Sequence, residues 1–259
     1  MTKTVKRVRI AHLYPELLNL YGDRGNLLAL VRRLALRGFE AEVRRIGVGD
    51  AFRPDEHDLV FLGGGQDYEQ AILMADLLAH KAAAIREAVE DDRAFLCICG
   101  GYQLMGRYYR TAEGRQLDFV GALDLWTVGG EKRLIGNTAY RSDLLEQAGK
   151  DPWIVGFENH SGRTFLGAGV KPLATVVRGH GNNGDDGTEG AAYRNVFGTY
   201  SHGSVLPKNP GFADLVLERA LARRYGEDGP LAPLDDAYER LAQTAALRAL
   251  SVDRSRRNG

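Results

Sequence analysis

The chain has 259 residues, 44% hydrophobic and 26% charged, which is the composition of a globular protein with one large domain or two small ones. Its 34 basic and 34 acidic side chains balance, so the net charge gives no case for a nucleic acid or an anionic membrane as partner. Two cysteines are too few for a disulfide framework, and no run of about 18 apolar residues is present that could span a membrane. We therefore expect a cytoplasmic protein in a reducing compartment, with no bound nucleic acid and no membrane insertion.

The N-terminal part alternates between strand-like and helix-like segments. Strand-like runs cover residues 8–14, 39–46, 58–62 and 94–98, and residues 59–62 and 94–98 are continuously apolar. Residues 27–37 and 69–90 carry apolar side chains at helical spacing. This alternation predicts an α/β fold with a mostly parallel sheet covered on both faces.

From about residue 115 the pattern changes to shorter alternating segments separated by turn signals, which predicts an antiparallel layer or an extension of the first sheet. These segments are residues 133–140, 153–157, 173–177 and 195–200, and residues 210–224 and 235–250 read as closing helices. The sequence has no internal repeat and no linker rich in Pro, Gly or Ser. We expect one domain over residues 1–250 and a polar C-terminal tail over residues 251–259.

The most informative segment is the apolar run 94–98, followed by Cys99, Gly100 and Gly101. A strand that ends in a nucleophile before glycine and a helix is typical of a nucleophile elbow, a sharp turn that lifts the side chain clear of the sheet. The N-terminus of the following helix favours a reactive thiolate. We predict that Cys99 is a nucleophile and that Cys97, inside the apolar run, is a core residue. The alternative is that both cysteines only fill the core.

A thiol nucleophile needs a base, and His202 is the best placed of the six histidines. It ends a β-like run and is followed by Gly203, so it can reach across the mouth of a sheet to another strand. A structural, hydrogen-bonded histidine fits the local pattern equally well, and only the pairing with Cys99 favours a catalytic role.

The glycines Gly63, Gly64 and Gly65 end a neighbouring strand. Their backbone N–H groups could stabilise an oxyanion, for which one donor contributes about 3 kcal/mol. A tight strand-to-helix turn that needs only small residues explains the glycines as well.

Motifs for phosphate or metal binding are missing or out of context. The G-x-G-x-x-G match at residues 179–184 is followed by Asp185-Asp186-Gly187 and not by a helix, which predicts a hairpin loop and no dinucleotide site. Gly149-Lys150-Asp151 lacks the upstream glycine and the hydroxyl of a Walker A motif. We expect no cofactor and no metal in this chain.

The run Cys99-Gly100-Gly101-Tyr102-Gln103 resembles the Cys-x-Gly-x-Gln elbow of class I glutamine amidotransferase domains, in the subgroup like cobyric acid synthase. Other segments resemble one branch of it, the glutaminase subunits of lipid II isoglutaminyl synthases. They are residues 12–15, 18–26, 63–67, 133–137, 156–160, 181–184 and 198–203, so the resemblance covers most of the chain. It implies a three-layer, flavodoxin-like α/β fold with a mostly parallel sheet and an antiparallel extension.

The resemblance also implies an activity. Glutamine would be hydrolysed to glutamate and ammonia through a thioester on Cys99, with His202 as base. Ammonia would pass, within a heterodimer, to a MurT-like, Mur-ligase-like ATPase that handles lipid II and amidates the D-glutamate of its stem peptide during peptidoglycan synthesis. ATP and Mg²⁺ are expected on that partner, in keeping with the missing nucleotide motif here.

The resemblance assigns further roles by position. Backbone N–H groups of Gly64 or Gly65 and of Gly100 would hold the oxyanion. Gln103 matches the elbow glutamine that helps to hold substrate, and Arg133 matches a substrate-gating arginine, whose guanidinium suits the α-carboxylate of glutamine. Without the resemblance, Gln103 is a polar residue at a helix start and Arg133 is a surface residue on a strand.

One position departs from the general pattern of the class, in which a glutamate follows the histidine by two residues. Ser204 stands there, so His202 lacks its usual orienting carboxylate. We expect the partner chain to supply a carboxylate or to hold the dyad in register, which would make the isolated chain a weak glutaminase. Glu158 is a rival from within the chain.

Other functions stay open at this point. The chain could be a glutaminase for another ammonia acceptor, as in cobyric acid synthesis, or a cysteine-dependent amide hydrolase of the same fold. It could also be a binding subunit that keeps the elbow without activity, although the presence of both Cys99 and His202 argues against this.

Overall fold

The computed structural model describes residues 5–65, 67–226 and 229–253 of the chain. A first, six-stranded sheet has the order β11-β12-β4-β3-β1-β2, with all neighbours parallel except β11 and β12. Its strands are β1 (Arg7–Leu13), β2 (Glu40–Ile46), β3 (Leu59–Leu62), β4 (Ala94–Ile98), β11 (Ala191–Tyr193) and β12 (Val196–Thr199). The predicted mostly parallel sheet is confirmed.

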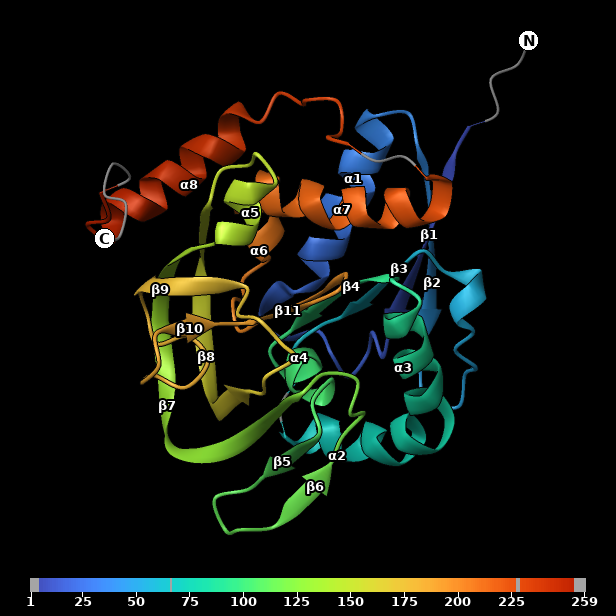
Figure 1. The fold of residues 1–259 in the computed structure, drawn as a ribbon, viewed down its shortest axis with the longest axis vertical. Coiled ribbons are helices and arrows are strands. Elements are labelled where there is room, and N and C mark those ends of the chain that lie inside the picture. The colour runs from blue at the N-terminus through green and yellow to red at the C-terminus, as the bar shows by residue number, and fades with distance from the viewer. Residues whose placement is uncertain (1–4, 66, 227–228, 254–259) are drawn as a thin grey trace.

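Helices cover both faces of this sheet, as Figure 1 shows, with α1 and α7 on one side and α2, α3 and α4 on the other. The helices of the chain are α1 (Arg24–Leu36), α2 (Asp67–Asp76), α3 (Ala82–Glu90), α4 (Gly100–Leu104), α5 (Asp143–Gln147), α6 (Val205–Lys208), α7 (Pro210–Tyr225) and α8 (Ala237–Ala249). Because the central strands β3 and β4 are covered on both faces, every one of their side chains is buried, which explains their unbroken apolar sequence.

The long helix expected over residues 69–90 is divided in two. A π-helical turn, Leu77–Lys81, separates α2 from α3. Lys81 is buried there and pairs with Asp76, which also accepts a hydrogen bond from the Tyr14 hydroxyl at 2.7 Å. The local hydrophobic spacing continues through this turn, so the sequence could not show the interruption.

Strands between residues 108 and 189 form a second sheet with the order β10-β9-β7-β5-β6, in which β8 pairs with β7. Its strands are β5 (Tyr108–Arg110), β6 (Gln116–Asp118), β7 (Leu125–Arg141), β8 (Trp153–Leu166), β9 (Ala174–Arg178) and β10 (Thr188–Glu189). Single bridges between Phe157 and His202 and between Lys171 and Ala192 join it to the first sheet. The glycine-rich residues 179–184 connect the antiparallel strands β9 and β10, so the predicted hairpin loop is confirmed.

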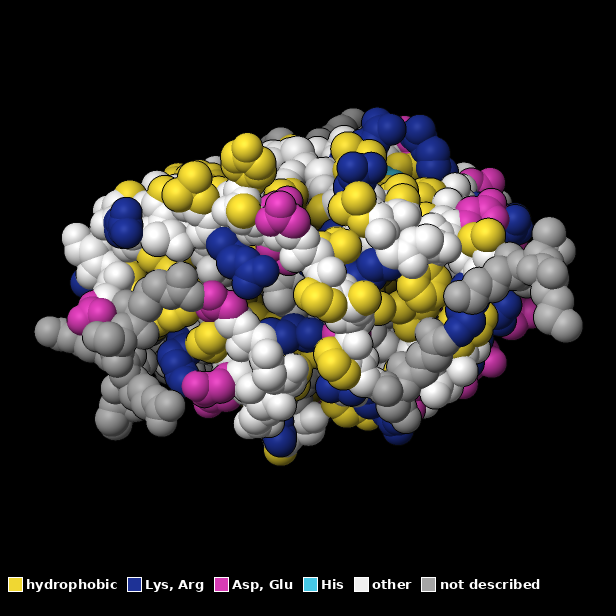
Figure 2. Space-filling model, turned by 90° about the horizontal axis from the view of Figure 1, so that it is seen from above, with side chains coloured by type: hydrophobic (Ala, Val, Ile, Leu, Met, Phe, Trp, Pro, Cys, Tyr) yellow, Lys and Arg dark blue, Asp and Glu magenta, His cyan; other side chains and the backbone are white. Residues whose placement is uncertain are grey.

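The surface seen from above is mixed in character. Figure 2 shows basic and acidic side chains lying among hydrophobic and uncharged ones on that face. Among the described residues, no helix combines the length and the hydropathy that crossing a bilayer requires.

The elbow at the end of β4 depends on a close approach between β3 and α4. The N–H of Gly101 donates to the carbonyl oxygen of Gly63 at 3.1 Å. A Cβ atom on Gly101 would lie 2.7 Å from that oxygen and 2.7 Å from Cβ of Leu62. Both neighbours belong to the sheet edge, so neither can move aside without shifting the glycine turn after β3.

We therefore expect Gly101→Ala to lower the free energy of unfolding by about 1–3 kcal/mol, the usual cost of overpacking. Gly136→Ala is the matched control, because a Cβ atom there meets nothing within 4 Å. Urea denaturation followed by circular dichroism measures both. Equal stability of the two variants would contradict this account of the β3–α4 contact.

Candidate active site

Four chain segments bring functional groups to one edge of the first sheet. Asp23 follows β1, Gly64 follows β3, Cys99 follows β4 and His202 follows β12. These four strands are neighbours and parallel, so their carboxyl ends meet at the same edge. Open α/β sheets bind their ligands at this edge, which makes it the candidate active site.

Cys99 lies in a strained turn between β4 and α4. Its backbone has φ +48° and ψ −104°, a conformation that costs a residue other than glycine about 1–3 kcal/mol and that clusters at active sites. Its N–H donates to the carbonyl oxygen of Thr199 at 2.8 Å, which fixes the turn to the end of β12. The predicted sharp turn is therefore present. Cys97 is fully buried in the core, as predicted, and burial raises the pKa of its thiol.

His202 is fully buried and held from two sides. Its backbone N–H donates to the carbonyl oxygen of Phe157 at 2.6 Å, and its ring nitrogen Nδ1 lies 3.2 Å from Oδ2 of Asp23. The expectation that the orienting carboxylate comes from a partner chain, or from Glu158, is therefore wrong. Asp23 of this chain, itself fully buried, occupies that position.

The surroundings of His202 raise its pKa to about 10. Burial lowers the pKa, but the charge of Cys99 and the hydrogen bonds with Asp23 and Cys99 outweigh burial. The ring nitrogen Nδ1 lies against Asp23. The other ring nitrogen, Nε2, makes no hydrogen bond of ordinary geometry within the described part of the chain, so it is available to the Cys99 thiol. With this pKa the ring is protonated at neutral pH, so His202 can act as a proton donor beside Cys99.

The glycine turn after β3 serves the histidine–aspartate pair. The N–H of Gly64 donates to Oδ2 of Asp23 at 2.8 Å, so this donor is occupied and the expectation that it holds the oxyanion is wrong. A Cβ atom on Gly64 would lie 2.6 Å from Cε1 of His202 and 2.8 Å from Oδ2 of Asp23, so the pair requires glycine here. Gly100 is the first residue of α4, where N–H groups lack partners within the helix. Gly100 and Gly65 stay the predicted oxyanion donors.

Glu158 is engaged in other contacts. Its carboxylate accepts hydrogen bonds from the Tyr140 hydroxyl at 2.9 Å and from the N–H groups of His180 at 2.7 Å and Gly181 at 3.0 Å. Burial raises the pKa of Glu158, but its hydrogen bonds outweigh burial and lower it. Glu158 therefore holds the loop after β9 against β7 and β8 and does not orient His202.

Gln103 lies in α4, nearly buried, and its Nε2 donates to the Tyr200 hydroxyl at 3.0 Å. That hydroxyl also lies 2.6 Å from Oγ1 of Thr164 in β8. Gln103 thus ties the helix after the elbow to the segment that carries His202. Its role in holding substrate stays a prediction.

Arg133 lies within the irregular stretch of β7, where the register with β8 shifts between Gly129 and Leu134. Its Nε donates to Oδ1 of Asn159 at 2.7 Å, and its Nη2 donates to the carbonyl oxygen of Asn159 at 3.0 Å. Nδ2 of Asn159 donates to the Tyr21 hydroxyl at 2.7 Å, and the Tyr21 ring meets the His202 ring edge-on with centroids 4.9 Å apart. The structure therefore links Arg133 to His202 through two side chains.

Sequence reasoning missed the individual importance of Asp23 and Tyr21. Asp23 directly precedes α1, a position where aspartate is an ordinary capping residue, yet its side chain makes no cap hydrogen bond. The one available signal is its place after the first strand of a parallel sheet, at the same edge as Cys99.

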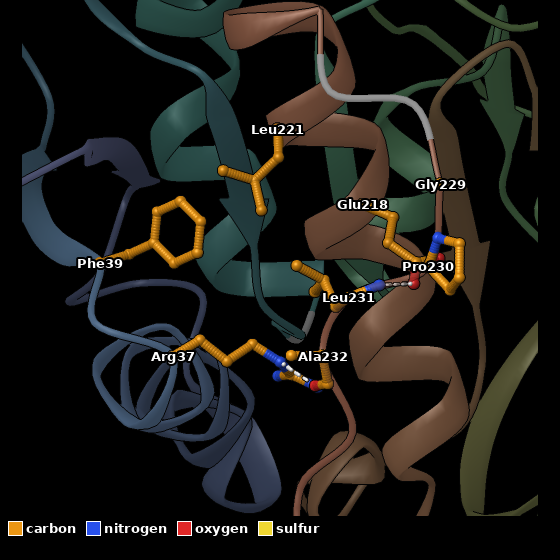
Figure 3. A pocket seen from close by; sticks show the side chains of 8 residues that line it. All are labelled: Arg37, Phe39, Glu218, Leu221, Gly229, Pro230, Leu231 and Ala232. Atoms are coloured by element: carbon orange, nitrogen blue, oxygen red, sulfur yellow. Dashed lines mark hydrogen bonds between the residues drawn. The ribbon is translucent and has the colours of Figure 1, made fainter.

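A pocket of about 390 Å³ lies at the opposite end of the fold, where α1 ends and β2 begins (Figure 3). Arg37 donates to the carbonyl oxygen of Ala232 at 2.7 Å, and the N–H of Leu231 donates to Glu218 at 2.8 Å. These bonds hold residues 229–232 against α1 and α7. The pocket contains neither Cys99 nor His202 and is not the candidate active site.

A parallel α/β sheet, a strained cysteine turn and a buried histidine–aspartate pair are together the features of a cysteine-dependent amide hydrolase. Residues 9–210 match the CobB/CobQ-like glutamine amidotransferase domain, and the chain belongs to this family. The expected enzyme class, a glutamine amidotransferase, is therefore confirmed.

Two relatives cover most of the chain. It is 39% identical over 231 residues to the lipid II isoglutaminyl synthase (glutamine-hydrolyzing) subunit GatD of Streptococcus pneumoniae. The match spans 89% of this chain and 86% of that protein. It is 41% identical over 215 residues to the subunit of the same name from Staphylococcus aureus. That match spans 83% of this chain and 85% of that protein. The expected resemblance to this branch is confirmed.

Two solved structures share the fold at low identity. PurLQS from Thermotoga maritima has a TM-score of 0.55 at 19% identity and covers 94% of this chain and 99% of that chain. The glutaminase domain of Trypanosoma brucei CTPS with bound acivicin has a TM-score of 0.54 at 13% identity and covers 88% of this chain and 98% of that chain. The expected glutamine amidotransferase fold is confirmed.

The Asp23–His202 contact predicts a pH effect. Asp23→Asn removes one of the two charges that stabilise the imidazolium, the other being that of Cys99, so the pKa of His202 should fall from about 10 part of the way towards the ordinary 6.5. The raised pKa also means that protonation of His202 stabilises the folded chain fully below about pH 6.5 and that this contribution is lost as pH rises through about 10. Nitrogen NMR of the labelled imidazole measures the pKa directly.

Glu158→Gln is the control for this titration, because Glu158 is a buried carboxylate that is bonded elsewhere. We expect it to leave the His202 titration in place. A fall in the pKa of His202 in Glu158→Gln but not in Asp23→Asn would reverse the assignment.

Proposed function

We propose that this chain is the glutaminase subunit of a lipid II isoglutaminyl synthase. The observation that carries the proposal is the convergence of Cys99, His202 and Asp23 at the carboxyl edge of the parallel sheet. The identity of 39–41% to two subunits of that name, over most of each chain, supports the choice of pathway.

In the first half of the reaction, the Cys99 thiolate attacks the side-chain carboxamide carbon of glutamine. The N–H groups of Gly100 and Gly65 stabilise the oxyanion that forms. His202, protonated at neutral pH, gives its proton to the leaving nitrogen, and ammonia departs as the carbon–nitrogen bond breaks. A γ-glutamyl thioester on Cys99 and a neutral His202 remain.

In the second half, His202 takes a proton from water as the water oxygen attacks the thioester carbon. The carbon–sulfur bond breaks, glutamate leaves and Cys99 returns as the thiolate beside protonated His202. Asp23 keeps its hydrogen bond to Nδ1 throughout and so presents Nε2 to each proton transfer.

The ammonia serves a partner subunit. We propose that this partner is a MurT-like ATP-dependent ligase that binds ATP, Mg²⁺ and lipid II and converts D-glutamate of the stem peptide to D-isoglutamine. The chain itself then needs no cofactor, and a cytoplasmic location would give it access to the precursor. Because Asp23 already lies against His202, the partner need not supply a carboxylate to the catalytic site in this proposal.

The purified chain alone should therefore release ammonia from glutamine. Cys99→Ala should abolish the release, because no thioester can form. Cys97→Ala is the matched control, since this second cysteine lies in the core two residues away, and it should retain activity in the folded fraction. A coupled glutamate dehydrogenase assay measures ammonia, and activity that survives Cys99→Ala would refute the nucleophile assignment.

The acceptor is tested with the MurT-like partner present. Glutamine labelled with ¹⁵N in its amide should transfer the label to the stem peptide of lipid II in the presence of ATP. With Cys99→Ala, glutamine should fail as the nitrogen source while ammonium chloride restores amidation, because only the supply of ammonia is lost. If the chain hydrolyses glutamine but no label reaches lipid II, the glutaminase serves another acceptor, as in cobyric acid synthesis.

A further inference from the structure

The Asn159 side chain can adopt only one orientation between its two neighbours. A guanidinium has donors and no acceptor, so the atom of Asn159 that faces Nε of Arg133 must be the carbonyl oxygen Oδ1. The amide nitrogen Nδ2 therefore faces Tyr21 and donates to its hydroxyl oxygen at 2.7 Å. As a result, the Tyr21 oxygen accepts a hydrogen bond, and its own hydrogen is available to a second acceptor.

Tyr21 is held in an unusual backbone conformation. It has φ +52° and ψ +26°, a left-handed conformation that costs a residue with a side chain about 1–2 kcal/mol. Its side chain is 47% exposed, so burial does not explain why the conformation is kept. The contacts that hold the ring are those with Asn159, with His202 at 4.9 Å and with Phe157 at 6.1 Å between centroids.

Arg133 has N–H donors that its contacts with Asn159 do not use. Its Nε and Nη2 are used by Asn159, and no carboxylate in residues 5–65, 67–226 and 229–253 forms an ion pair with its guanidinium. An exposed guanidinium held in place by a neutral amide is suited to bind a carboxylate from outside the chain. The Tyr21 hydroxyl is on the other end of the same amide group.

The family resemblance already assigns Arg133 to the α-carboxylate of glutamine. We propose that Tyr21 adds a hydroxyl hydrogen bond to the same carboxylate, so that the two residues form a carboxylate clamp, and that Asn159 orients both of them. This inference rests on the proposed glutaminase function, and its new elements are Tyr21 as a specificity-determining residue and Asn159 as a positioning residue. Because the Tyr21 ring also lies against His202, the clamp sets the bound carboxylate at a fixed distance from the imidazole and so places the side-chain amide at the catalytic site.

The clamp predicts an effect that depends on the substrate. Tyr21→Phe removes only the hydroxyl and keeps the ring against His202. It should lower kcat/KM for glutamine about threefold to tenfold, the value of one hydrogen bond, through a higher KM. It should leave unchanged the reaction of 4-aminobutanamide, which is glutamine without its α-carboxylate. Tyr238→Phe on α8 is the matched control, since that hydroxyl is on an 85% exposed side chain outside the site.

The second variant tests Asn159. Asn159→Ala frees both Arg133 and Tyr21, so it should lower kcat/KM for glutamine more than Tyr21→Phe does, again with little effect on 4-aminobutanamide. The clamp would be overturned if either variant lowered kcat/KM equally for glutamine and 4-aminobutanamide. It would also be overturned if Tyr21→Phe left kcat/KM for glutamine unchanged.

A binding measurement keeps the inference separate from the proposed reaction. Cys99 is alkylated with iodoacetamide in the presence of increasing glutamine or 4-aminobutanamide, and the concentration that gives half protection is determined. In the chain without a substitution, glutamine should give half protection at a lower concentration than 4-aminobutanamide does. Tyr21→Phe should reduce the ratio of these two concentrations about threefold to tenfold. If glutamine protects in this way but is not hydrolysed, the glutaminase proposal fails and the clamp stands; if hydrolysis is normal and the difference is unchanged, only the clamp fails.

Discussion

The candidate active site depends on the contact between Asp23 and His202, two residues that are 179 positions apart in the chain. Both side chains are fully buried, and an unpaired charge in that position would be strongly destabilising. The contact therefore requires the whole order of the sheet, because only the adjacency of β1, β3, β4 and β12 brings the two strand ends together. Gly64 completes the arrangement by donating its N–H to the same carboxylate and by leaving space for the imidazole.

The sequence predicts the parts of the site that local physics determines. A continuous apolar strand followed by Cys99 and glycine predicts a sharp turn, and the structure contains that turn. Asp23 and Tyr21 could not be found in this way, since their significance lies in contacts with β3, β8 and β12 that no local pattern encodes. The same reason explains Glu158, which the sequence offered as an alternative carboxylate for His202 but which is bonded to the loop after β9.

The second sheet, which the sequence described only as an antiparallel layer or extension, contributes directly to the site. Phe157 in β8 accepts the backbone N–H of His202, and Asn159, two residues further along the same strand, holds Arg133 and Tyr21. Side chains two apart on a strand point to the same side, and those of Phe157 and Asn159 both contact Tyr21. The register shift in β7 before Leu134 is the type of irregularity that re-aims a side chain, here Arg133 towards Asn159.

The position of Ser204 shows that the carboxylate that orients His202 comes from another part of the chain. It occupies the position where the general pattern of the class has glutamate, and its hydroxyl donates to the carbonyl oxygen of Gly22 at 2.6 Å. This bond ties the loop after His202 to the segment between β1 and α1, which carries Tyr21 and Asp23, the aspartate that lies against His202. The orienting carboxylate is thus buried within the chain, whereas Tyr21 and Arg133 are exposed at the same site. A substitution at either exposed residue would alter the proposed carboxylate clamp without altering the buried Asp23–His202 pair.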